Sequence, residues 1–169
     1  MTIAQAMIPE YDMEFGITRT VLERVPTDKW DWKIHDKSNT VGWLANHLAD
    51  IPSWVEMTLC HASLDLNPPG EEPYKVPDLR ELSEVIASFD ANVALGRQLL
   101  ESVDDATLMD SWSLLKEGET LMTIPRVACI RTWVLNHTIH HRAIMTVYLR
   151  VNDAAVPSIY GPSGDDPLV

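Results

Sequence analysis

The stretch from Trp133 to Arg150 constrains the fold more than any other part of the chain. It contains no proline or glycine, and its apolar residues recur every three or four positions, which predicts an amphipathic helix. At about 100° per residue, His137 and His141 lie one above the other in the middle of the apolar stripe. His140 lies about 60° to the other side, nearer the edge. Two imidazoles are therefore expected to point into the interior.

A buried imidazole pair needs a physical reason. Two neutral histidines in an apolar seam each need a hydrogen-bond partner, and charging them there costs free energy. Two nitrogens at positions i and i+4 can instead bind one divalent ion from the same side. The spacing alone is a weak signal, because one satisfied core histidine and one edge histidine are the more common explanation. A third histidine in a similar setting strengthens the metal hypothesis.

His47 is that third histidine. Residues 41–61 predict a second helix, and Pro52 is expected to kink or break it one turn beyond His47. The neighbours of His47 on the apolar stripe, within about 60°, are Trp43, Leu44, Ile51, Trp54 and Thr58. Aromatic residues on an inner helix face usually fill the core, so Trp43, Trp54 and Trp133 are interpreted as core residues. Trp54, which follows the kink, is the best candidate among them for a pocket wall.

Two further helices are expected. Residues 2–24 predict the first, with Pro9 near its start. Asp78 and Glu81 have the spacing of a capping box and predict a third helix that ends near Ser102. Gly96 lies on its inner face, where the missing side chain would let a neighbouring helix approach closely.

The connecting segments complete the prediction. Residues 67–77 contain four prolines and a glycine and are interpreted as a surface loop. Residues 106–123 form either a short helix or a small hairpin. Pro125 suits the first turn of the last long helix. With no confident strand, the chain predicts an all-α fold: a four-helix bundle with a short irregular segment or small extra helix before the last long helix, in a single domain of residues 1–169.

Helical bundles build metal sites from inward side chains of facing helices. His47, His137 and His141 are expected to form such a site, with no other buried ionisable group. Three protein ligands and one open position are typical of catalytic zinc, and a water or thiol in that position has a lowered pKa. Nickel and iron are alternatives, although the usual iron triad includes a carboxylate that this set lacks.

Composition excludes several classes of function. A formal net charge of −12 and the absence of a Lys/Arg run argue against a nucleic-acid surface. No stretch of about 18 apolar residues predicts a membrane span, and the first 15 residues do not resemble a secretory leader. Cys60 and Cys129 are interpreted as small core residues, and two cysteines without an export signal favour a reducing, cytoplasmic setting.

Three segments, in this order and spacing, resemble the DinB/YfiT family of metalloenzymes: DWKIHDKSNTVGWLANHLADIPSW, LNHTIHHRAIMTVYLR and VPSIYGPSGDD. The resemblance covers roughly residues 3–166. It implies a four-helix bundle of non-standard up-and-down topology, often a homodimer, with a divalent ion held by three histidines. By motif, these are His47, His137 and His141, and His140 is interpreted as a residue behind the metal ligands. Ala143 and Ile144 stand where relatives commonly have Gly-Gln.

Some members of that family transfer bacillithiol or glutathione-like thiols, or isomerise maleylpyruvate with mycothiol. The resemblance therefore implies a metal-dependent enzyme that activates a low-molecular-weight thiol, or water, for attack on a small electrophilic substrate. The alternative is a non-catalytic, stress-related binding protein in which a metal, or the histidine cluster alone, is structural. An open coordination position reached from solvent would favour the enzyme.

The back of the last helix predicts an additional neighbour. Opposite His137 lie the small and apolar residues Ala128, Leu135, Ile139 and Thr146. Such a face is expected to meet either residues 106–123 or a second subunit, and a homodimer is predicted. Arg142 lies about 140° from His137 and is expected to face away from the metal, in a salt bridge or an interface.

Overall fold

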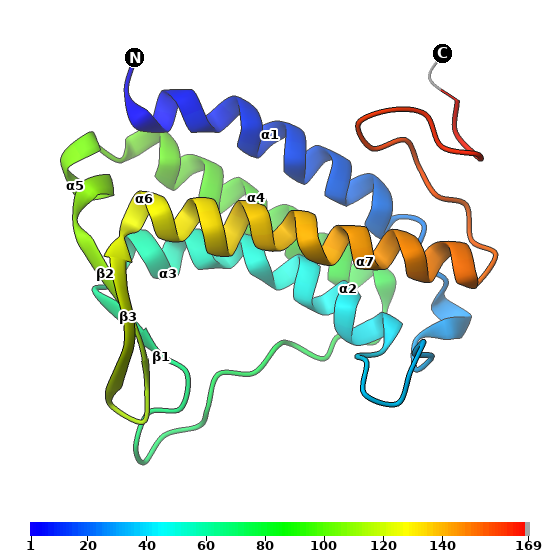
Figure 1. The fold of residues 1–169 in the computed structure, drawn as a ribbon, viewed down its shortest axis with the longest axis horizontal. Coiled ribbons are helices and arrows are strands. Elements are labelled where there is room, and N and C mark those ends of the chain that lie inside the picture. The colour runs from blue at the N-terminus through cyan, green and yellow to red at the C-terminus, as the bar shows by residue number, and fades with distance from the viewer. Residues whose placement is uncertain (168–169) are drawn as a thin grey trace.

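A computed structural model describes residues 1–167. Four long helical segments lie side by side (Figure 1). They are α1 (Ile3–Leu22), the interrupted pair α2 (Val41–Asp50) and α3 (Trp54–Cys60), α4 (Leu82–Ser102), and a run of α6 (Arg126–Cys129), a π-helical segment (Ile130–Asn136) and α7 (His137–Val151). Both α1 and α2 pack against α4 and against α7. The helix starts and ends therefore largely follow the hydrophobic periodicity of the sequence.

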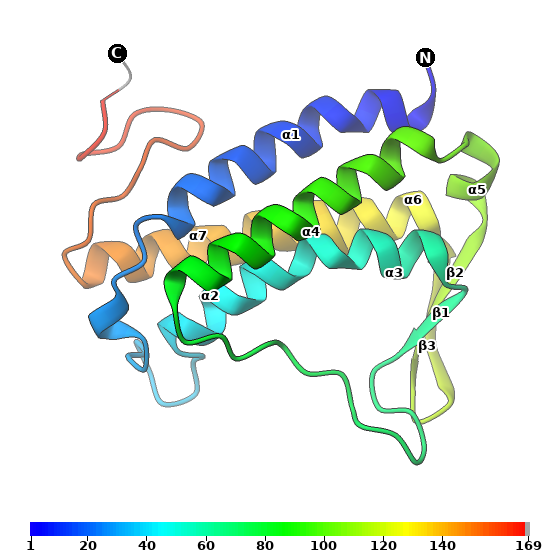
Figure 2. The same ribbon diagram turned by 180° about the vertical axis from the view of Figure 1, so that it is seen from behind.

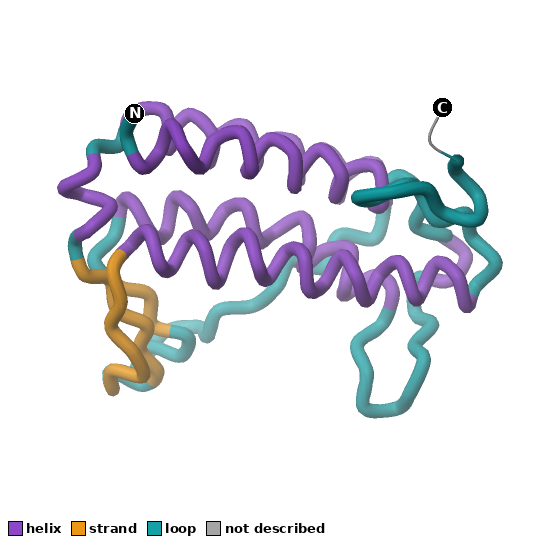
Figure 3. Tube along the Cα trace, turned by 45° about the horizontal axis from the view of Figure 1, so that its top comes forward, coloured by secondary structure: helices purple, strands orange, loops and turns teal. Residues whose placement is uncertain are grey.

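The fold is mostly helical, as predicted, but a small sheet at one end of the helices means that it is not purely α (Figures 1 and 3). Its strands are β1 (Ser63–Asp65), β2 (Ser111–Lys116) and β3 (Glu119–Pro125), with β1 parallel to β2 and β2 antiparallel to β3. The short helix α5 (Asp105–Met109) precedes β2, so residues 106–123 contain both structures that the sequence left open. The Asp65 carboxylate accepts the backbone N–H groups of Asn67, Glu117 and Gly118, which ties β1 to the hairpin turn.

Pro52 interrupts the second helical segment as predicted. The helix α2 ends at Asp50, a 3-10 turn spans Ile51–Ser53, and α3 begins at Trp54. The residues that follow β1 form an irregular loop that passes along α2 and α3 to the start of α4 (Figure 2). The predicted surface loop at residues 67–77 lies within it.

The first helix, Ile3–Leu22, confirms the predicted range of residues 2–24, but its start is not near Pro9. It begins at Ile3 because Thr2 and Gln5 form a capping box and the Asp105 carboxylate accepts the N–H of Ile3. Pro9 therefore lies inside α1.

The helix α4 begins at Leu82, so Asp78 and Glu81 do not form the predicted capping box. The side-chain amide of Asn46 pairs with both the N–H and the C=O of Leu79, at 3.0 and 2.9 Å. This paired amide holds the backbone of Leu79 in place before the helix. The predicted end at Ser102 is confirmed.

The back of the last helix is covered in part within the same chain. Leu135 is fully buried in the core and α7 packs against α1, whereas Ile139 is half-buried. The additional neighbour of this face is therefore partly α1, and the homodimer stays a prediction. Arg142 faces α1, as expected, in a buried ion pair with Glu14 at 2.6 Å.

Two smaller findings concern the cysteines and the membrane. Cys129 is buried, but Cys60 is exposed at the end of α3, so its interpretation as a core residue is wrong. Within residues 1–167, no helix combines the length and the apolar character that a membrane crossing requires.

The close approach at Gly96 generates a stability prediction. A Cβ atom there would lie 2.4 Å from the Tyr11 hydroxyl and 3.3 Å from the backbone oxygen of Pro52. Tyr11 is fully buried and donates to the carbonyl of Val93, so it has little room to move. Gly96→Ala is expected to lower the free energy of unfolding by about 1–3 kcal/mol despite the better helix propensity of alanine.

The matched control is Gly16→Ala in α1, where no atom lies within 4 Å of the added Cβ. That change is expected to raise the free energy of unfolding by about 0.5–1 kcal/mol. Urea unfolding of the two variants measures both values. Equal stabilities for the two variants would contradict the packing described here.

Candidate metal centre

Two helices supply the three histidines that the sequence singled out. His47 lies on α2, whose first turn is capped by the Thr40 hydroxyl, which accepts the N–H of Trp43 at 3.1 Å. His137 is the first residue of α7, directly after the π-helical segment, and His141 follows one turn later. A π-helical turn is wider than an α-helical turn and is frequent at functional sites.

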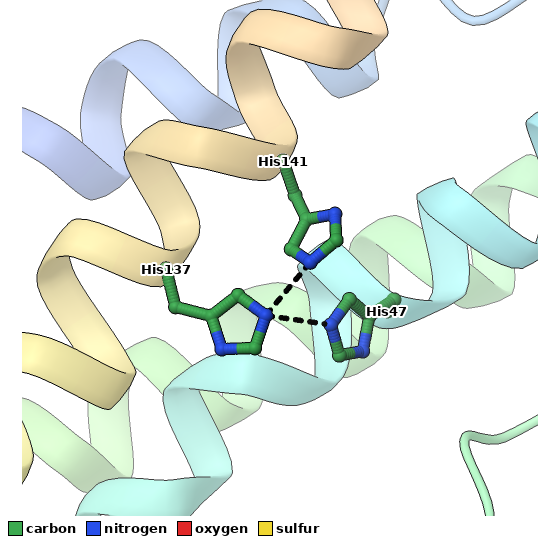
Figure 4. Close-up of side chains that lie close together, drawn as sticks. All are labelled: His47, His137 and His141. Carbon is green, nitrogen blue, oxygen red and sulfur yellow. Dashed lines mark hydrogen bonds between the residues drawn. The ribbon is translucent and has the colours of Figure 1, made fainter.

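The three imidazoles converge through their Nε2 atoms (Figure 4). The Nε2 of His137 lies 3.3 Å from that of His47 and 2.7 Å from that of His141. His47 is 5% exposed, whereas His137 and His141 are half-buried. His140 is exposed and lies outside this cluster, although its ring centroid is 4.9 Å from that of His141. The convergence is as the periodicity predicted.

The opposite ring nitrogens have no protein partner. The Nδ1 atoms of His47, His137 and His141 are buried and accept or donate no hydrogen bond among the described residues. Buried polar atoms without partners are uncommon in folded proteins, because each costs free energy. If the proton of each neutral ring is on Nδ1, the three Nε2 lone pairs face one another and repel. A cation among the Nε2 atoms would offset this repulsion.

Burial keeps these rings neutral. It lowers the pKa of His47 to about 3 and that of His141 to about 4, with further lowering by the neighbouring imidazoles. Burial, and then His140, also lower the pKa of His137. Neutral imidazole is the form that binds metal ions, so the three donors are ready for an ion at neutral pH.

The cluster is surrounded by three tryptophans that the sequence analysis interpreted as core residues. Trp43 stacks on His47 with ring centroids 4.6 Å apart. Trp54 meets the edges of both His47 and His137, at 5.6 and 5.2 Å. Trp133 is 38% exposed and lies 6.0 Å from His137. The core interpretation is therefore wrong for Trp133, whereas Trp43 and Trp54 are half-buried and pack against the core. Trp54 also forms part of a pocket wall, as expected.

An acidic group near the cluster was missed. Asp50 is buried one turn after His47 on α2, and its carboxylate accepts hydrogen bonds from Tyr74 and, at 3.2 Å, from Trp54. Burial raises the pKa of Asp50 above its usual range. The expectation that no other ionisable group is buried is wrong here and at the Glu14–Arg142 pair. The i+3 spacing of Asp50 from His47 was a usable signal, but nothing in the loop sequence marked Tyr74.

A cavity of about 220 Å³ opens beside His47. Its wall includes His47, Trp54, Tyr74, Trp112, Cys129 and Trp133, with leucine and methionine side chains from α3, the following loop and the sheet. Burial raises the pKa of the Cys129 thiol, which keeps it protonated. The cluster is thus adjacent to a space that a small molecule could fill.

The donor set fits a borderline divalent cation. Around a tetrahedral zinc ion with bonds of about 2.0–2.1 Å, neighbouring nitrogens are about 3.4 Å apart. The separation of His47 and His137 is 3.3 Å, close to this value, whereas that of His137 and His141 is 2.7 Å and would have to lengthen around an ion. No carboxylate or thiolate belongs to the group that could hold an ion within residues 1–167. Three imidazoles suit zinc, nickel or iron better than magnesium or calcium, which prefer oxygen ligands.

The lowered pKa values predict how stability depends on pH. As the pH falls from about 7 through 6.5 towards 4, histidines of the unfolded chain bind protons that His47 and His141 do not bind when folded. The metal-free protein should therefore lose stability over this range. His141→Gln removes one such group and should show a shallower loss between about pH 7.5 and pH 5 in urea unfolding. Identical pH dependence in the two proteins would contradict neutral burial.

Comparisons with known proteins agree with this fold. The family model of the DinB superfamily matches residues 10–145. A DinB-like protein from Bacillus cereus ATCC 10987 superposes with a TM-score of 0.71 at 20% identity, over 94% of this chain and 98% of that one. A DinB-like protein from Bacillus subtilis gives 0.64 at 13% identity, over 95% and 99%. No curated protein matches the chain. The resemblance seen in the sequence is confirmed, and the chain belongs to the DinB superfamily.

Proposed function

We propose that this protein binds one divalent metal ion, zinc in the first place, through the Nε2 atoms of His47, His137 and His141. The bound ion would activate a low-molecular-weight thiol, or water, for attack on a small electrophilic substrate. The observation that carries the proposal is the convergence of three neutral imidazoles, one buried and two half-buried, beside a cavity. Nickel and iron are the alternatives for the metal.

The chemistry follows from the donor set. A divalent ion held by three neutral ligands acts as a Lewis acid and lowers the pKa of a thiol or water in its open position. In a thiol transfer, the sulfur forms a bond to the electrophilic carbon, the leaving group departs with the electron pair of the broken bond, and the thiol proton passes to solvent. In this proposal His140 accepts that proton before it reaches solvent; its ring is exposed, with its centroid 4.9 Å from that of His141.

The protein surroundings support this role. Trp43 and Trp54 cover the imidazoles with apolar rings and exclude water from one side of the cluster. Electrostatic interactions are stronger where water is excluded. His137 and His141 are half-buried rather than buried, and the proposal needs solvent to reach the cluster from their side.

A second candidate function rests on the position of the cluster between two helices. His47 comes from α2 and the other two histidines from α7, so an ion among them would also cross-link the helices. In that case the metal is structural and the protein is a non-catalytic, stress-related binding protein. Both candidate functions include the proposals that the protein is a homodimer and that it lies in the cytoplasm.

The ligand set predicts which histidine changes abolish metal binding. His47→Ala and His141→Ala should each weaken zinc binding by about 100-fold or more, because losing a direct ligand exceeds the 10–100-fold effects of residues behind ligands. His140→Ala should stay within about threefold of the unchanged protein, because the His140 side chain makes no hydrogen bond to a ligand histidine among the described residues and so does not orient one. Competition with a chromogenic chelator measures the affinities on untagged protein. A loss in His140→Ala as large as in His141→Ala would refute the assignment.

Metal removal separates the catalytic candidate from the structural one. After chelator treatment, the helices should remain folded by circular dichroism, because the apolar core of α1, α2, α4 and α7 does not depend on the ion. Consumption of glutathione with 1-chloro-2,4-dinitrobenzene should fall to the rate without protein and return with zinc. A metal-free protein that unfolds, together with no thiol consumption at any pH, would favour the structural candidate instead.

A further inference from the structure

The cavity beside His47 has room for a small organic molecule. Its volume of about 220 Å³ exceeds that of an engineered apolar cavity of about 150 Å³ that takes up benzene. Aromatic and aliphatic side chains dominate the wall, including Trp54, Trp112, Trp133, Leu114 and Met122. A single substituted ring, or a short branched alkyl group, therefore fits its size.

The polar atoms at the floor of the cavity are already engaged. The indole N–H of Trp112 donates to the carbonyl of Met57 at 3.3 Å. The hydroxyl of Thr58 lies 3.5 Å from the sulfur of Cys129. These groups have their partners within the protein, so they offer a ligand little to bind.

Near the histidines, the hydroxyl of Tyr74 is engaged as well, whereas the buried Nδ1 of His47 has no partner among the described residues. The Tyr74 hydroxyl donates to the Asp50 carboxylate and accepts from the indole N–H of Trp54 at 2.9 Å. No lysine or arginine is among the residues that line the cavity. A charged group placed there would lose its hydration and find only the neutral ring of His47 as an unpartnered polar group, so its binding is disfavoured.

We propose that this cavity binds the neutral, apolar body of the electrophilic substrate, an aromatic ring or branched alkyl group, and does not bind the thiol. The inference rests on the proposed function, because only that function makes the bound molecule an electrophile. His47 belongs to both the wall and the histidine cluster, whereas His137 and His141 do not line the cavity, so a molecule in the cavity contacts the cluster through the ring of His47. Low-molecular-weight thiols of the glutathione type carry charged groups that this wall does not accommodate.

Recognition of a cation by the aromatic rings is the main competing interpretation. Aromatic faces attract ammonium groups, and an acidic residue lies nearby. However, the Asp50 carboxylate is not part of the wall and already accepts hydrogen bonds from Tyr74 and Trp54. The leucine, methionine and cysteine side chains of the wall offer a cation nothing, so a neutral occupant is favoured.

Binding to the metal-free protein tests the inference without any contribution from the ion. Chelator-treated protein is titrated calorimetrically with ethylbenzene, benzoate and benzyltrimethylammonium, which share one ring and differ in charge. Ethylbenzene should bind, and the dissociation constant of each charged probe should be at least about tenfold higher. A tenfold difference corresponds to about 1.4 kcal/mol. Absence of ethylbenzene binding, or equal binding of either charged probe, would overturn the proposal.

Two neighbouring positions on β3 provide a matched pair of variants. Met122 lines the cavity, whereas Leu121 is 56% exposed and does not. Met122→Trp should fill the cavity and weaken ethylbenzene binding about tenfold or more, and Leu121→Trp should leave it within about twofold. Met122→Phe is the smaller replacement if Met122→Trp does not fold by circular dichroism. Equal affinity in the folded Met122 and Leu121 variants would refute the assignment of the cavity.

The same variants separate this inference from the proposed function. If thiol consumption is metal-dependent but is equally fast with iodoacetate and 1-chloro-2,4-dinitrobenzene, and is unchanged in Met122→Trp, the inference fails while the function stands. If ethylbenzene binds as expected but no electrophile is consumed with any metal, the function fails, and the assignment of the occupant as an electrophile fails with it. Selective loss of the aromatic reaction in Met122→Trp supports both.

Discussion

The convergence of three neutral imidazoles is the constraint on which the rest of the site depends. Nitrogens from α2 and α7 lie within 4.8 Å of one another, and burial keeps the rings uncharged. The features that interrupt regular helix lie next to them: the break at Pro52, which puts Trp54 against His47, and the π-helical segment that leads directly into His137. Departures from regular helix are common at functional sites, where geometry matters more than helix stability.

The opposite side of α7 is fixed just as firmly. Arg142 is 2% exposed and contacts the backbone oxygen and carboxylate of Glu14 on α1, and the hydroxyl of Tyr160 in the C-terminal tail. Removing one partner of a buried ion pair is costly, because the other charge is left without compensation. This pair therefore fixes the rotation of α7 about its axis. The histidines on the other face then point towards α2 and the cavity formed with the sheet.

The sequence predicted what depends on long helical periodicity and missed what depends on contacts across the chain. His47, His137 and His141 could be grouped because α2 and α7 are strongly periodic. Helical angles gave the direction of Trp43 and Trp133 but not whether a neighbouring element covers these side chains. In addition, the π-helical segment changes the rotation per residue before His137, so a regular step of about 100° does not hold for Trp133. The extended backbone at Leu79, held by Asn46, and the short sheet that includes Met122 had no local signal strong enough to predict them.

Anomalous diffraction from a crystal of the untagged protein grown with zinc tests the central claim most directly. The account predicts one strong peak per chain, at about 2.0–2.2 Å from the Nε2 atoms of His47, His137 and His141, with at least one position open towards the cavity or solvent. A structure with no ion at these nitrogens, or with an ion held by His140 in place of His141, would contradict it.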